Sequence, residues 1–227
     1  SLTRRRHLIS DSISLHCNLE DFTTIAAELP DPFRLLLKES VGSTNDELRR
    51  LAEAGTPEGL IVLAEIQTDG RGRRGAAWFS PPGESLAFSV LLRPTQPKAL
   101  WPRLALATGL AVAEALEDFL PLVGVKWPND VWIAGRKIAG ILVEAGKDFV
   151  VVGIGLNVNT LEFPEAVSGT ATSLALELGS PVSRPEVLAA IIRQLGVRNQ
   201  QIGSDFSSVM DAIRLRCVLT GKRVTLL

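Results

Sequence analysis

Short apolar runs joined by turns are the feature of this sequence that most constrains its fold. The runs cover residues 60–67, 85–93, 123–127, 131–133, 137–145 and 149–156. They have the lengths of β-strands, and the last four follow one another so closely that they predict a meander. Because helical segments interrupt the runs without a regular βαβ alternation, the pattern favours an α+β sheet with helices on one side.

Three segments predict those helices. The first begins at Thr44, which stands in capping-box spacing with Glu47, and its apolar residues share one face. The second covers residues 104–120, where apolar residues recur at helical spacing, and the third opens at Ser183 with another capping box.

The length of 227 residues fits one main domain. Residues 1–32 end at a pair of prolines and are interpreted as a lead-in. Residues 33–216 form the expected main domain. Residues 217–227 read as the start of a small C-terminal β domain that is truncated or missing.

The net charge, the cysteine spacing and the length of the apolar runs argue against several classes of function. The formal net charge is -1, so the chain lacks the overall basic charge that holds proteins on nucleic acid. Cys17 and Cys217 lie far apart and outside any C-x-x-C motif, which indicates neither a disulfide framework nor a zinc site. The apolar runs fall short of the roughly 20 residues that span a bilayer. We therefore expect a cytoplasmic protein with neither membrane nor nucleic acid as a partner.

A glycine-rich segment at residues 70–75 fits the G-x-G-x-x-G expression of dinucleotide-binding folds. In those folds the motif opens a helix. Here Pro81 and Pro82 follow within two turns and prevent one, so we reject a dinucleotide-binding fold.

The same segment places Arg71, Arg73 and Arg74 in a loop beside Trp78. Guanidinium groups make bidentate contacts to phosphate or carboxylate, and an indole offers a surface for stacking. The loop is therefore a candidate anion site. The alternative is a solvated basic turn.

A second candidate site combines Lys126, at the end of one apolar run, with Lys137, at the start of another. Between them a proline-fixed turn carries Asn129 and Asp130. Two ammonium groups near one mouth of the sheet suit a reaction that joins two anions. The alternative is that both lysines are strand-end charges and that the turn has no further role.

A third candidate is the last apolar run, which carries Gly153 and Gly155 on one face. A flat ligand or another backbone could approach the strand there, and a packing bulge is the alternative.

The sequence holds no Walker A loop, G-x-S-x-G elbow or H-E-x-x-H motif, and its histidines, His7 and His16, both lie in the lead-in. Histidine catalysis and a serine nucleophile are therefore not expected.

Taken together, these segments resemble the catalytic domain of biotin protein ligases of the monofunctional type, which lack a DNA-binding module. The matching stretches are Gly-Ser-Thr-Asn at 42–45, the glycine- and arginine-rich stretch at 65–75 with Trp-Phe-Ser-Pro at 78–81, Lys-Trp-Pro-Asn-Asp at 126–130, and the segments 135–144 and 153–157. They follow the family's order and spacing over most of the chain. The resemblance implies a mixed, largely antiparallel sheet backed by helices, in the class II synthetase-like fold that lipoate ligases share.

The resemblance also implies an ATP-dependent reaction and the residues that serve it. Biotin would be activated to biotinyl-5'-AMP and transferred to a specific lysine of a biotin carboxyl carrier protein. Biotin would contact Ser43, Thr44, Asn45, Gln67, Arg71, Arg73, Trp78 and Lys137, and the nucleotide would contact Arg73, Arg74, Trp78, Asn129 and Asn157. The residues expected to act in the reaction are Arg71, Arg73, Lys126, Lys137 and Asp130, with Asp130 as base or orienting partner of the incoming amine.

Elementary chemistry agrees with these roles. The biotin carboxylate must approach the α-phosphorus of ATP, and cationic side chains with a bound Mg²⁺ would offset the repulsion between the two anions. The mixed anhydride must then be kept from water until the carrier lysine attacks its carbonyl. No enzyme nucleophile is needed. ATP and biotin are thus the expected substrates and Mg²⁺ the expected ion, with no protein metal ligand identified.

Two other functions stay open: a lipoate or octanoate ligase of the same fold, and a regulator that binds biotinyl-AMP without transferring it. The expected partner is a carrier protein or carrier domain of a carboxylase. A homodimer through sheet edges is the oligomeric state that such a sheet would allow. About 40 residues precede Gly42, too few for a winged helix-turn-helix module and its connection, so DNA binding is not expected.

Overall fold

The computed structural model describes residue 19 and residues 21–223. Most of the expected lead-in, with His7, His16 and Cys17, lies outside the described residues, as do residues 224–227 of the expected C-terminal β domain. Within the described part of the chain, no helix is both long and apolar enough to cross a membrane.

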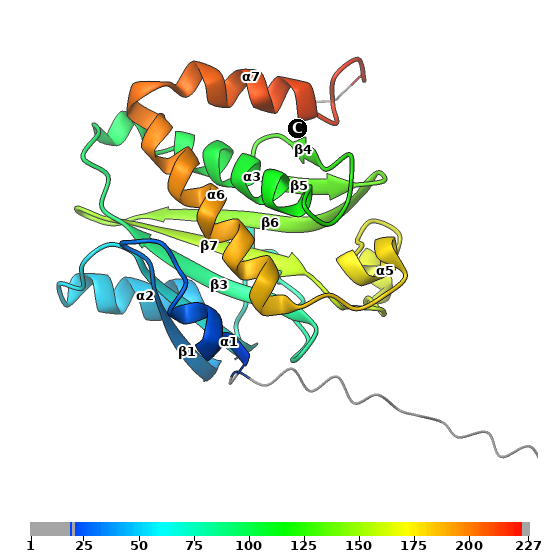
Figure 1. Ribbon diagram of the computed structural model, residues 1–227, viewed down its shortest axis with the longest axis horizontal. Coiled ribbons are helices and arrows are strands. Elements are labelled where there is room, and N and C mark those ends of the chain that lie inside the picture. The colour runs from blue at the N-terminus through cyan, green and yellow to red at the C-terminus, as the bar shows by residue number, and fades with distance from the viewer. Residues whose placement is uncertain (1–18, 20, 224–227) are drawn as a thin grey trace, which may run out of the picture.

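A seven-stranded sheet forms the centre of the fold (Figure 1). Its strands are β1 (Arg34–Val41), β2 (Leu60–Gln67), β3 (Ser85–Leu92), β4 (Gly124–Lys126), β5 (Asp130–Ile133), β6 (Arg136–Ala145) and β7 (Val150–Asn157). Their order across the sheet is β1-β2-β3-β7-β6-β5-β4. β1 and β2 run parallel, and the other neighbouring strands run antiparallel. The predicted mixed, largely antiparallel sheet is confirmed.

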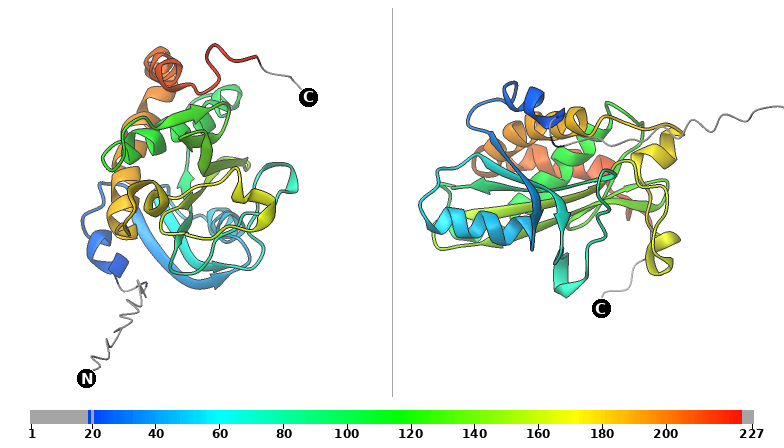
Figure 2. Two further views of the ribbon diagram at one scale, coloured as in Figure 1. Left: turned by 90° about the vertical axis from the view of Figure 1, so that its right-hand side faces the viewer. Right: turned by 90° about the horizontal axis from the view of Figure 1, so that it is seen from below.

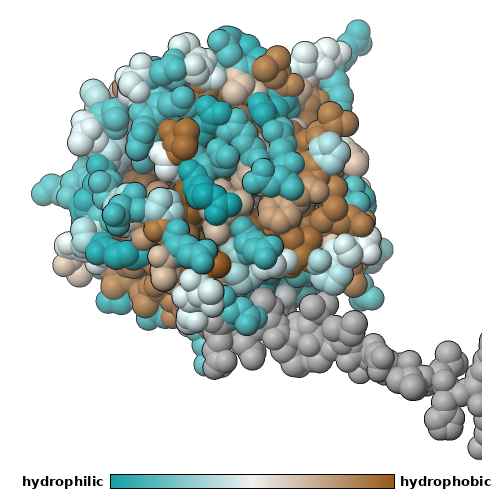
Figure 3. Space-filling model, viewed as in Figure 1, coloured by the Kyte–Doolittle hydropathy of each residue, from teal (hydrophilic) through white to brown (hydrophobic). Residues whose placement is uncertain are grey.

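The two longest helices cover one face of this sheet. The helices are α1 (Asp21–Ala26), α2 (Thr44–Glu53), α3 (Arg103–Leu116), α4 (Glu165–Ser168), α5 (Leu174–Leu178), α6 (Arg184–Ser204) and α7 (Phe206–Arg216), with short 3₁₀ turns η1 (Arg73–Gly75) and η2 (Lys98–Leu100). α3 and α6 pack side by side on the sheet, and α1 and α7 lie against α6 (Figure 1). On the molecular surface at this face, hydrophilic residues are spread widely and a group of hydrophobic residues lies toward α5 (Figure 3).

The opposite face is covered in part by α2 (Figure 2). Leu48 and Ala52 of this helix pack on Val62, Leu91 and Val151. The expectation of helices on one side of the sheet is therefore wrong. β3 gives the reason: all eight of its residues are buried, so its alternating side chains need cover on both faces.

The ends of the described chain also pack on this fold. Phe22 of α1 is fully buried in the main core, so the boundary expected at residue 32 does not mark the edge of the packed domain. At the other end, the backbone of Cys217 forms an isolated parallel β-bridge with Val125 of β4. The Val218 N–H donates to the Val125 carbonyl at 3.1 Å. Residues 217–218 thus lie against the edge of the central sheet.

Candidate active site

A pocket lies on the face of the sheet that carries α2. Its walls come from the N-terminal end of α2, the loop of residues 68–84 that joins β2 to β3, and the strands β6 and β7. We call residues 68–84 the β2–β3 loop. The free volume of about 50 Å³ is well below the several hundred Å³ of typical ligand pockets. The pocket adjoins a larger hollow of about 740 Å³ that shares Arg71, Arg73 and Asn129 with it.

Three consecutive residues at the start of α2 are almost fully buried against the pocket: Ser43, Thr44 and Asn45. The Thr44 N–H and hydroxyl both approach the Gln67 amide oxygen, at 2.9 and 3.1 Å. Thr44 is the first residue of the helix, and Ser43 occupies the N-cap without a side-chain cap bond. The capping-box prediction for Thr44 is therefore wrong, because its hydroxyl contacts the neighbouring strands instead of capping the helix.

A buried serine on β3 links this helix to the sheet. The Ser89 hydroxyl lies 2.8 Å from the Thr44 hydroxyl and 2.6 Å from the Asn45 amide oxygen. The Asn45 amide nitrogen in turn donates to Glu144 of β6 at 2.6 Å. The amide of Asn45 rests on Gly153, where a Cβ atom would collide with it. The bare strand surface at Gly153 is thus filled by a side chain from α2.

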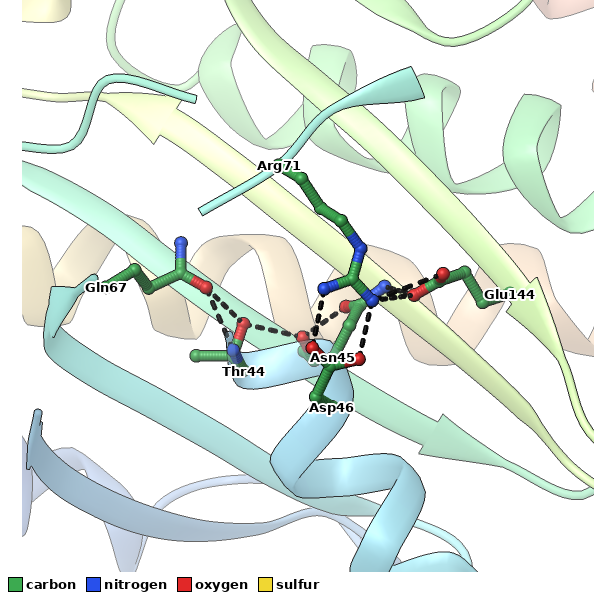
Figure 4. A network of polar contacts seen from close by, with 7 residues as sticks. Thr44, Asn45, Asp46, Gln67, Arg71 and Glu144 are labelled. Carbon is green, nitrogen blue, oxygen red and sulfur yellow. Dashed lines mark hydrogen bonds and ion pairs between the residues drawn. The ribbon is translucent and has the colours of Figure 1, made fainter. Parts of the chain in front are cut away.

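Arg71 ties the β2–β3 loop to both α2 and β6 (Figure 4). Its guanidinium donates to both carboxylate oxygens of Asp46 at 2.6 Å and to Glu144 at 3.2 Å. The hydrogen bond from Arg71 holds the pKa of Asp46 below its ordinary value, although partial burial acts in the opposite direction. The same contact raises the pKa of Arg71. Arg71 therefore stays charged inside a network that reaches the pocket.

Lys137 reaches the pocket because β6 carries a bulge. Val131 pairs with Ala139 and Trp132 with Lys137, so Ile138 is an extra residue between the two pairs. Ile138 is fully buried in the main core, and Lys137 is turned to the pocket face instead. Its ammonium lies 2.8 Å from Asp130 and 5.6 Å from the centre of the Trp78 ring. The bulge thus turns the Lys137 ammonium toward the pocket, where it pairs with Asp130, a residue that does not itself line the pocket.

The Trp78 indole covers the glycine surface beside Lys137. A Cβ atom at Gly155 would collide with the ring, and one at Gly140 would lie 3.2 Å from it. The indole N–H is buried and, within the described residues, has no hydrogen-bond partner. Such a donor is available to a ligand.

The other arginines of the loop differ in position. Arg73 lines the pocket and donates to the Asn129 side-chain oxygen at 2.8 Å. Arg74 is exposed, adopts a positive φ of 57°, and lines an adjoining hollow that Arg71, Arg73 and Asn129 also line. Arg73 and Arg74 are thus both exposed to solvent, but Arg73 also lines the pocket and bonds Asn129, and Arg71 is only half-exposed.

Four expected site residues do not line the pocket: Lys126, Asp130 and Asn157, in addition to Arg74. The Lys126 ammonium lies 4.0 Å from the centre of the Trp132 ring, in a hollow near the C-terminal end of the described chain. Asn157 is buried and donates to the Thr172 carbonyl at 3.0 Å. Conversely, Ser89 and Glu144 join the polar network although sequence reasoning gave them no role, since their contacts with Asn45 span 44 and 99 residues.

Comparison with known proteins gives one consistent result. The model of the biotin/lipoate A/B protein ligase family matches residues 37–159. A biotin--[acetyl-CoA-carboxylase] ligase of Mycobacterium tuberculosis is 38% identical over 197 residues, which cover 81% of this chain and 70% of the relative. The bifunctional ligase/repressor BirA of Escherichia coli is 36% identical over 189 residues, and the chain spans 58% of its length.

Solved structures show the same similarity. A biotin protein ligase from Aquifex aeolicus in complex with biotin and ATP matches with a TM-score of 0.73 and 36% identity, over 81% of this chain and 78% of that one. A biotin protein ligase from Leishmania major in complex with biotinyl-5-AMP matches with a TM-score of 0.73 and 25% identity, over 87% and 86% of the two chains.

Proposed function

The chain belongs to the biotin/lipoate A/B protein ligase family, and from this premise we propose that it is an ATP-dependent biotin protein ligase. Biotin and ATP form biotinyl-5'-AMP and pyrophosphate, and the biotinyl group then moves to a lysine of a carrier protein. The observation that carries the proposal is that one pocket combines the Thr44–Gln67 pair with three cations, Arg71, Arg73 and Lys137.

The Thr44 end of the pocket is proposed to bind the biotin ring system. A ureido group has two N–H donors and one carbonyl acceptor, and burying them without partners costs free energy. Thr44 fixes the amide oxygen of Gln67, which leaves the amide nitrogen as a donor. Ser43, Thr44 and Asn45 add hydroxyl and amide groups that are themselves nearly fully buried.

The cationic end is proposed to promote adenylation. Attack of the biotin carboxylate on the α-phosphorus forms one P–O bond and breaks the bond to pyrophosphate, so negative charge concentrates where two anions meet. Arg71, Arg73 and Lys137 line the pocket and would face both reactants. Their benefit is largest in the transition state, where the anions are closest.

Trp78 is proposed to cover the adenylate. The indole lies over Gly140 and Gly155 and carries a buried N–H without a partner in the described part of the chain. A flat aromatic cover would keep water from the mixed anhydride before transfer. Asn129, Arg74 and Asn157 are the further residues proposed to contact the nucleotide.

Transfer requires that the carrier amine lose a proton as it attacks the anhydride carbonyl. The amide bond forms, and AMP leaves with the electrons of the broken C–O bond. Asp130 is the proposed base or orienting group, because its carboxylate lies 2.8 Å from the ammonium of Lys137, which lines the pocket. Lys126 is a further proposed contributor, and its side chain must leave the Trp132 ring to reach the reactants.

Mg²⁺ is proposed to arrive with ATP. Among residues 19 and 21–223, no group of three or more His, Cys, Asp or Glu side chains is placed to hold a metal ion. Mg²⁺ commonly keeps several waters and binds substrate phosphates, which needs no such cluster.

The proposed acceptor is the carrier protein or domain of a biotin-dependent carboxylase. ATP–pyrophosphate exchange with biotin, lipoic acid or octanoic acid as the only acid tests the assignment of the first step. We expect exchange with biotin and little with the other two. Exchange that depends on lipoic or octanoic acid instead would favour the alternative ligase, and no exchange with any of them would overturn the proposal.

A further inference from the structure

We infer that the ion pair between the buried Arg184 and the partly buried Glu65, on the face of the sheet away from the pocket, positions the β2–β3 loop and with it Gln67 and Trp78. The inference deepens the proposed function and rests on it. Neither residue lines the pocket. They are positioning residues.

The contacts of the pair join three elements. Arg184 is the first residue of α6 and is 2% exposed. Its two terminal nitrogens donate to the Glu65 carboxylate on β2 at 3.2 and 3.1 Å. One of them also donates to the Ser85 carbonyl at 2.9 Å, and Glu65 accepts from the Gly83 N–H. The N-terminal end of α6 lies over this end of the sheet (Figure 1).

These contacts hold the two ends of the β2–β3 loop, which we call its stems, at one point. Glu65 stands two residues before Gln67, where the chain leaves β2, and Gly83 and Ser85 flank its return into β3. The middle of the loop is held from the other face, by Arg71 with Asp46 and Glu144 and by Arg73 with Asn129. Loss of the stem contacts would therefore shift the loop relative to α2 and β7.

The surroundings of this pair favour a role in positioning the loop over a role in stabilising the fold. Glu65 alternates with Ile61 and Leu63, which lie in the main core, so its carboxylate enters an apolar layer. A charged pair in such a layer stabilises a fold little better than apolar side chains of similar size. What the pair adds is directed hydrogen bonding to two backbone groups, Gly83 N–H and Ser85 carbonyl, which apolar side chains cannot provide.

The chain offers a matched control on the same helix. Arg198 of α6 makes a similar two-pronged contact with Glu114 of α3, and both side chains are mostly buried. That contact lies between helices and touches no residue of the loop. Arg184→Met and Arg198→Met can therefore be compared for stability in urea, for tryptic cleavage after Arg73 and Arg74, and for the kinetics of biotinyl-AMP formation.

We expect Arg184→Met to raise the rate of loop cleavage severalfold and the KM for biotin about tenfold or more, because small displacements of binding groups are costly. Arg184→Lys should recover part of both effects, since lysine restores the charge but not the two-pronged geometry. Arg198→Met should lose stability but keep the cleavage rate of the loop and the KM of the unmodified chain.

Equal loop cleavage and equal KM in the Arg184→Met and Arg198→Met variants would overturn the inference. If Arg184→Met does not fold, Glu65→Gln serves the same test, because it keeps an acceptor for Gly83 while removing the charge that holds Arg184. Loop cleavage does not depend on activity. A wild-type chain that forms no adenylate would therefore contradict the proposed function and still leave the positioning of the loop open to measurement.

Discussion

Lys137 shows how a single inserted residue can supply a site with a charge. Regular alternation along β6 from Gly140 would send Lys137 toward the core, and the extra residue Ile138 reverses that direction. As a result, the ammonium lies 2.8 Å from Asp130 and 5.6 Å from the centre of the Trp78 ring. The bulge is the structural basis for placing Lys137 in the proposed adenylation step.

Lys137→Ala should slow biotinyl-AMP formation more than Lys137→Arg, because arginine keeps the charge but is bulkier and planar. Single-turnover formation of the adenylate, measured beside the urea midpoint, separates a chemical role from a structural one. Lys147→Ala, at an exposed lysine in the turn after β6, is the control and should change stability by no more than about 0.5 kcal/mol. Adenylate formation at the wild-type rate in Lys137→Ala would rule out the assignment.

The pair of Arg71 with Asp46 predicts a dependence of stability on pH. The pKa of folded Asp46 lies below its ordinary value of 3.8 because Arg71 donates to it. Its contribution to stability is therefore complete above that ordinary value and is lost as the pH falls through the lower, folded pKa. The urea midpoint of the wild type should fall more steeply below about pH 4 than that of Asp46→Asn. Asp46 is half exposed, so the difference should be small, and parallel curves would contradict the assignment.

At the scale of elements, α2 supplies polar side chains that line the pocket. Its N-terminal turn supplies Thr44 and Asn45, and its C-terminal end is held by Arg93. The Arg93 guanidinium donates to the carbonyls of Ala52 and Thr56, at 3.0 and 2.9 Å. It also lies 5.8 Å from the centre of the Phe149 ring. The helix is thus fixed at both ends to the sheet.

Arg93→Met should destabilise the chain by about 1–3 kcal/mol, because partly buried carbonyls at the end of α2 lose a charged donor. The matched control is Arg214→Met in α7, whose guanidinium pairs with Asp211 at the surface and should matter by less than about 1 kcal/mol. Urea denaturation of both variants measures the difference. Equal midpoints would show that Arg93 does not hold the end of α2.

Individual elements also show what the sequence could predict. The runs at 60–67, 85–93 and 137–145 correspond to β2, β3 and β6 within one residue at each end, and the Ser183 cap is confirmed by its contact with the Glu186 N–H. β1 is missed because most of its residues are only half buried at the sheet edge. The cap predicted at Thr44 fails because Gln67, 23 residues away, competes for the hydroxyl.

At the scale of the whole molecule, the sheet separates the main hydrophobic core from the pocket. One face packs against α3 and α6 to form the main core, and the other carries α2 and the pocket. The motifs at 42–45, 65–75 and 135–144 could be read from the sequence, and the structure brings residues from all three to the pocket. Contacts that depend on the closed fold, such as Glu65 with Arg184 across 119 residues, leave no local spacing signal and could not be predicted.

The proposed reaction has two steps, activation of biotin and its transfer to a carrier lysine. The most direct test is mass spectrometry of a purified carrier domain of a biotin-dependent carboxylase after incubation with the chain, biotin, ATP and Mg²⁺. A matched carrier with arginine in place of its acceptor lysine is the control. We expect the carrier to gain the mass of one biotinyl group, only when ATP is present and only on the acceptor lysine. Biotinyl-AMP that forms and stays bound, with the carrier unmodified, would contradict the proposed transfer.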